Sequence, residues 1–154
     1  MPEGAALGVL LCAALVIGLA IGTLTGAVFL RAAVALYNKM AGGASSPRGV
    51  PEPAFGKATW IILATFMGQI IVGSLIAIST GAGPVAAGAG GKGVDVVALI
   101  SFPVGLLIMA AVLSAKLPTT FGRAILVTLC YVLVELLVVG ILVVIAVVVF
   151  GVLW

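Results

Sequence analysis

The sequence contains no histidine, only two cysteines and only four acidic residues among its 154 positions. Zinc sites and serine or cysteine triads are built from histidine, cysteine and carboxylate side chains, so this chain has few parts for such centres. Charged residues make up 7% of the chain, against about 25% in an ordinary globular domain. We therefore expect a protein that is not an enzyme and that needs neither a metal ion nor a cofactor.

What the chain has in abundance is apolar surface. Hydrophobic residues account for 64% of the sequence, glycine contributes another 21 residues, and the mean hydropathy is +1.48. Side chains this apolar cannot cover a water-soluble domain, so lipid is the expected solvent for most of the protein. The net charge of +3 comes from basic residues scattered between apolar runs, without the stripe that binds nucleic acid.

Uncharged or nearly uncharged runs are long enough to cross a hydrocarbon core of about 30 Å, which takes about 20 helical residues. The predicted transmembrane helices cover about 5–36, 58–80, 94–115 and 124–152. A cytoplasmic loop is expected at 37–57 and a glycine-rich outer loop at 81–93. Barrel strands would alternate polar and apolar residues, which these runs do not do. Residues 1–154 are thus predicted to form one all-α transmembrane domain, a four-helix bundle.

The distribution of basic residues predicts the orientation in the membrane. Six of the seven fall in or beside the first and third loops, namely Arg31, Lys39, Arg48, Lys57, Lys116 and Arg123. By the positive-inside bias, these loops face the cytoplasm and both termini lie outside it, in a multi-pass protein of a bacterial-type inner membrane. A cleaved signal peptide is disfavoured, because Glu3 stands where a basic segment belongs.

Side chains that suit the membrane interface flank the predicted spans. The expected anchors are Arg31, Lys57, Arg123, Trp60 and Trp154. Long basic side chains reach the headgroup region from a helix end, and tryptophan is enriched at both interfaces.

Small residues recur every four positions in the first predicted helix, at Ala14, Gly18, Gly22 and Gly26. A glycine zipper of this kind leaves one helix face without side chains, so another backbone can approach closely. Packing inside the bundle is the expected use of this strip, and contact with a second copy of the chain is the alternative.

A short sequence occurs twice at the start of a predicted span. Residues 55–58 read Phe-Gly-Lys-Ala, and residues 121–124 read Phe-Gly-Arg-Ala. Extending both copies without gaps aligns Gln69 with Glu135, the strongly polar residue inside each helix. A duplication would make two helical hairpins of the same orientation, related by a pseudo-two-fold axis along the membrane normal. The alternative is one convenient turn used twice.

Glu135 and Gln69 are the candidate intramembrane polar pair. Counting from Ala124 and from Lys57 at 1.5 Å per residue, they lie about 16 and 18 Å into a core of about 30 Å. An ionised carboxylate at that depth is costly, so it is either protonated or partnered. A glutamine amide can serve it in both states. Glu135 is interpreted either as a structural hydrogen-bonding group or as a proton- or cation-handling site.

Two functions follow from these patterns. The leading hypothesis is a non-enzymatic membrane component that acts by helix association, as an accessory subunit or an oligomeric scaffold. The alternative is a small transporter or channel with its site at Glu135 and Gln69. The expected partners are the lipid bilayer and either the protein itself or other membrane subunits, without nucleic acid.

Overall fold

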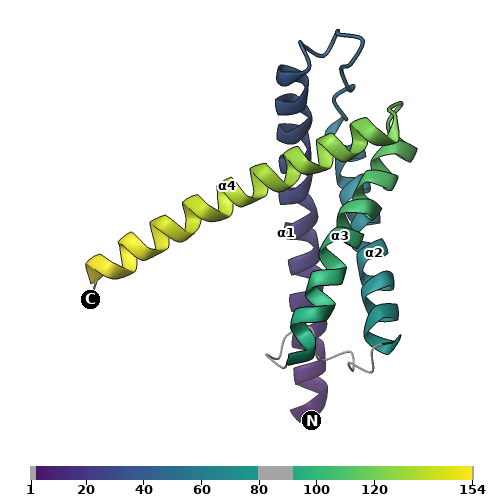
Figure 1. Cartoon of the computed structure of the whole chain (residues 1–154). Coiled ribbons are helices and arrows are strands. Elements are labelled where there is room, and N and C mark those ends of the chain that lie inside the picture. Colours follow the sequence, from purple (N-terminus) through teal and green to yellow (C-terminus); the bar gives the residue numbers. More distant parts are fainter. Residues whose placement is uncertain (1–2, 80–91, 154) are drawn as a thin grey trace.

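The computed structural model describes residues 3–79 and 92–153, and nearly all of them are helical. The helices are α1 (Glu3–Met40), α2 (Phe55–Ser79), α3 (Lys92–Lys116) and α4 (Phe121–Leu153) (Figure 1). Most of the expected outer loop at 81–93 lies outside the described residues, although Lys92 and Gly93 already belong to α3. Stretches of α1, α2 and α4 are long and apolar enough to cross a membrane, at Gly8–Met40, Phe55–Ile76 and Phe121–Val149.

The helices extend farther into the basic loops than the charge pattern alone predicts. α1 runs to Met40 instead of about residue 36, because arginine and lysine are good helix formers and do not stop a helix. The stop comes at Gly42 and Gly43, which have φ angles of 91° and 105°. The Gly43 N–H donates to the Asn38 carbonyl at 2.8 Å. This is the hydrogen bond of a Schellman cap, for which glycine is the favoured residue.

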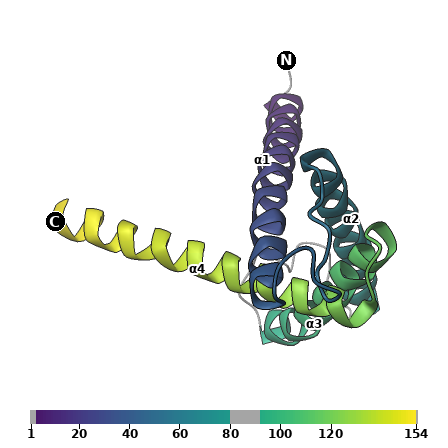
Figure 2. The ribbon, with the colours of Figure 1, turned by 90° about the horizontal axis from the view of Figure 1, so that it is seen from above.

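The helices contact one another as a ring. α1 packs on α2 and α4, and α3 packs on the same two helices. Among the described residues, the backbones of α1 and α3 do not approach each other closely, nor do those of α2 and α4. The first three helices lie roughly alongside one another, whereas α4 crosses α1 obliquely and its C-terminal half extends away from the rest (Figures 1 and 2). Only the first part of α4 therefore belongs to the expected four-helix bundle.

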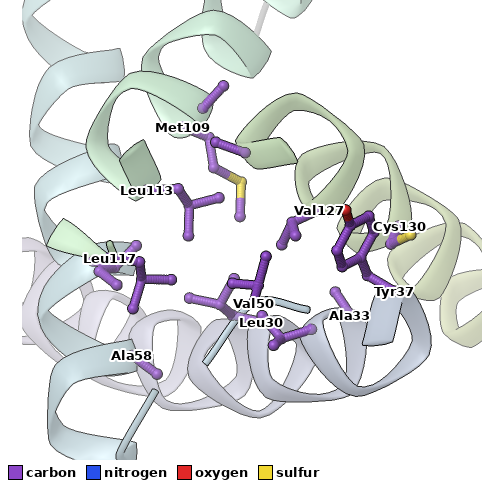
Figure 3. Packing of buried hydrophobic residues seen from close by; sticks show 14 of the residues in the cluster. Leu30, Ala33, Tyr37, Val50, Ala58, Met109, Leu113, Leu117, Val127 and Cys130 are labelled. Atoms are coloured by element: carbon purple, nitrogen blue, oxygen red, sulfur yellow. The ribbon is translucent and has the colours of Figure 1, made fainter. Parts of the chain in front are cut away.

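The apolar core lies at the end where the α1–α2 and α3–α4 connections are, and Figure 3 shows how its side chains pack. It joins the C-terminal halves of α1 and α3 to the N-terminal halves of α2 and α4. Fully buried members include Leu30, Val34, Val50, Ile61, Leu113 and Val127. In the opposite half, α1 is open, since nearly every described side chain from residue 8 to 21 is exposed. Packing is thus concentrated at the end that carries most basic residues.

Candidate functional site: a polar cavity between three helices

A cavity of about 400 Å³ lies between α2, α3 and α4. Its walls are mostly aliphatic, and four polar side chains line it: Gln69 from α2, Ser101 from α3, and Tyr131 and Glu135 from α4. Ligand pockets in proteins have volumes of about 300–1,000 Å³ and a few polar groups among apolar ones. The cavity has the size and composition of a binding site for a small molecule or a few waters.

Gln69 reaches the cavity across a glycine of α3. Its Nε2 atom lies 3.0 Å from the position that a Cβ atom would take at Gly105, and Gly105 is buried. A side chain at residue 105 would therefore displace the Gln69 amide. The glycine explains how a long polar side chain of α2 fits against α3.

Glu135 and Gln69 line the same cavity, as the predicted polar pair requires. Both side chains are exposed, and α3 packs between the two helices that carry them. The hydrogen bonds formed by the described residues do not include one between Glu135 and Gln69. Their direct interaction stays a prediction, whereas their access to one shared space follows from the geometry.

Two polar residues of the cavity were missed by the sequence analysis. Tyr131 lies four positions before Glu135, so both side chains fall on one face of α4. That spacing was a usable signal. Ser101 lies among apolar residues of α3 and offers no comparable pattern, because a lone serine is common in transmembrane helices.

The glycine strip of α1 contacts its neighbours at one end only. A Cβ atom at Gly26 would lie 2.9 Å from Cγ2 of Ile62 and 3.4 Å from the Tyr131 hydroxyl, so α2 and α4 both come close there. At Gly22 the nearest atom is 3.8 Å away, on the ring of Phe66. Nothing lies within 4 Å of that position at Gly18, and Ala14 is exposed.

The predicted interface anchors gather near one end of the molecule. Arg31 and Lys57 are exposed, Arg123 is half-buried, and Trp60 is 71% exposed on the second turn of α2. Trp154 lies outside the described residues. Because the α1–α2 and α3–α4 connections lie at the same end (Figure 1), most basic residues are brought to that end as well.

The polar side chains of the cavity can form hydrogen bonds, and its carboxyl and phenol groups can transfer protons. In residues 3–79 and 92–153, no group of three or more histidine, cysteine or carboxylate side chains is placed to hold a metal ion. Cys12 and Cys130 are free thiols, exposed and buried respectively.

The chain matches no protein-family model, no curated protein and no solved structure. Its function is therefore inferred from its own residues and their geometry.

Proposed function

We propose that the protein is a multi-pass inner-membrane protein that acts by helix association, as an accessory subunit or an oligomeric scaffold. Three long apolar helices support the membrane location, and the fourth helix, α3, is apolar from Ser101 to Lys116. Basic residues gathered near one end support an orientation with that end in the cytoplasm and both termini outside. Of the residues that the structure describes, few lie outside the helices.

The observation that carries the proposal is the free second half of α4. Residues 139–149 are all exposed and apolar, and they extend beyond the other helices (Figures 1 and 2). We call this segment the α4 arm. Gly140 within it has no neighbouring atom within 4 Å of a Cβ position, so a partner helix could approach closely there.

The length of α4 adds to this argument. Its 33 residues correspond to about 50 Å at 1.5 Å per residue, well beyond a hydrocarbon core of about 30 Å. An oblique path accommodates the excess length. That path also carries the arm away from its own bundle, to where van der Waals packing against a helix of another subunit would hold it.

The internal duplication belongs to the same proposal, and the burial pattern supports it. α2 and α4 begin at the phenylalanine of the repeated sequence. Ala58, Ile61 and Ile62 of the first copy are buried, and so are the aligned residues of the second, Ala124, Val127 and Thr128. Gln69 and Glu135, aligned by the repeat, line one cavity.

Cysteine cross-linking along the arm tests the association. In a background with Cys12 and Cys130 replaced by alanine, single cysteines are placed at each residue from 141 to 144. Cross-linked dimers, or cross-links to another subunit, should form at positions on one helix face and be weak on the opposite face. Matched controls at Ile70 and Ile71, exposed apolar residues of α2, should not cross-link. Equal cross-linking at arm and control positions would contradict the proposal.

The second candidate function is transport of a proton, cation or small solute through the cavity of Gln69, Ser101, Tyr131 and Glu135. The observation that favours it is the convergence of polar side chains from three helices. An intramembrane carboxylic acid that reaches such a space marks a functional-site hypothesis. Flux measurements on variants of Glu135 test it, as set out below.

A further inference from the structure

A second groove lies between the end of α1, the loop that follows it and the first turns of α4. It has a volume of about 570 Å³. Three leucines of α4, Leu126, Leu129 and Leu133, form its apolar floor, while Tyr37 and Arg48 line it from the other side. The leucines are spaced by three and four residues, so they lie on one helix face. Tyr37 and Cys130 meet at the inner edge of this groove, beside the core (Figure 3).

The backbone at Arg48 is held at this groove by hydrogen bonds from α1. The Tyr37 hydroxyl donates to the Arg48 carbonyl at 3.2 Å. Two residues later, Val50 is fully buried, and the Asn38 amide binds both its N–H and its carbonyl at 2.8 Å. Arg48 is an exposed residue, and none of the described carboxylates forms an ion pair with it. The loop thus fixes the backbone of Arg48 and leaves its charge available to a ligand.

An apolar floor with one unpaired cation at its rim matches an amphiphile with an anionic head. Arginine binds phosphate oxygens through parallel N–H donors, more specifically than a point charge does. Most of the other basic residues lie near this end of the molecule, and cationic segments attract anionic lipids. A neutral lipid would occupy the same groove but would interact less favourably with the charge of Arg48.

We propose that this groove binds an anionic phospholipid of the cytoplasmic leaflet, with the phosphate at Arg48 and an acyl chain along Leu126, Leu129 and Leu133. The inference rests on the membrane location and orientation proposed above, and it adds a lipid site to them. It does not depend on association through the α4 arm.

Native mass spectrometry of the purified protein in detergent tests this site. The probes are phosphatidylglycerol and phosphatidylcholine with identical acyl chains, titrated onto delipidated protein. The wild type should prefer phosphatidylglycerol. Arg48→Gln should weaken the binding of phosphatidylglycerol about fivefold, because one basic residue near an anionic surface contributes about that factor to the affinity. The matched control is Lys57→Gln, which removes an exposed cation outside the groove and should retain the preference.

A second variant tests the apolar floor. Leu129→Trp fills the groove and should lower the binding of both lipids. An unchanged preference in Arg48→Gln, or an equal loss in Lys57→Gln, would overturn the site. Extraction of membranes with alkaline carbonate distinguishes a failure of the lipid site from a failure of the proposed membrane location. Release of the chain from the membrane refutes the location, whereas lost specificity in a retained chain refutes only the groove.

Discussion

The contacts at Gly26 allow a quantitative prediction about the glycine strip of α1. Replacing Gly26 by alanine brings a Cβ atom to 2.9 Å from Cγ2 of Ile62, too close for a buried side chain that is 3% exposed. Overpacking of this kind costs about 1–3 kcal/mol. The gain in helix propensity from glycine to alanine offsets about 0.5–1 kcal/mol of that. The net expectation is a loss of about 0–2.5 kcal/mol in the free energy of unfolding.

The same strip supplies matched controls. Gly18→Ala meets no atom within 4 Å, so it should keep the helix-propensity gain of about 0.5–1 kcal/mol. Gly22→Ala makes an ordinary contact at 3.8 Å with Phe66. It should be no less stable than Gly18→Ala. Unfolding by sodium dodecyl sulfate in mixed micelles should therefore rank Gly26→Ala about 1–3 kcal/mol below Gly18→Ala.

A double-mutant cycle identifies the clash. Ile62→Ala alone should cost about 2–5 kcal/mol, as buried isoleucine truncations do. In the Gly26→Ala background it should cost about 1–3 kcal/mol less, because the added methyl group occupies part of the space vacated. Equal stabilities of Gly26→Ala and Gly18→Ala, with no coupling to Ile62, would refute this account of the strip.

Three further predictions concern the loop, the cavity and the topology. Asn38→Ala leaves the N–H and carbonyl of Val50 buried without their 2.8 Å partners and should cost about 2–4 kcal/mol in the same unfolding assay. Ser46→Ala, the control, loses one bond and should cost under about 1 kcal/mol. In liposomes, a transport role requires that Glu135→Gln abolish proton or cation flux without lowering the melting temperature. A structural role predicts that Glu135→Gln is nearly silent and that Glu135→Leu costs about 1–2 kcal/mol. For topology, a cysteine at Gly4 should react with an impermeant thiol reagent on intact cells, while one at Ser45 should react only after permeabilisation; the reverse pattern would overturn the orientation.

The helices could be predicted from the sequence because each is specified locally. Apolar runs free of charge give their positions, although the predicted end of α1 at about residue 36 fell short of Met40. The gathering of the basic loops at one end also follows, since antiparallel helices return the chain to the same side. Local patterns of this kind need no knowledge of the packing.

The packing could not be predicted, because it depends on which helices touch. Nothing in the composition of α4 shows that it crosses α1 obliquely, or that α3 packs between α2 and α4. The zipper pattern treats Gly18 and Gly26 alike, yet only Gly26 has close neighbours. The Asn38–Val50 hydrogen bonds join residues twelve apart across an irregular loop, which no periodicity indicates.

The mass of the protein extracted directly from its membrane tests the central claim, that the chain acts by association. Extraction into polymer-bounded native discs avoids detergent, and mass photometry or native mass spectrometry then counts the chains. Association predicts a defined multiple of 15.3 kDa, or a stable complex with other membrane subunits. Single chains that persist at high protein density, with the α4 arm uncrosslinked, would contradict the claim.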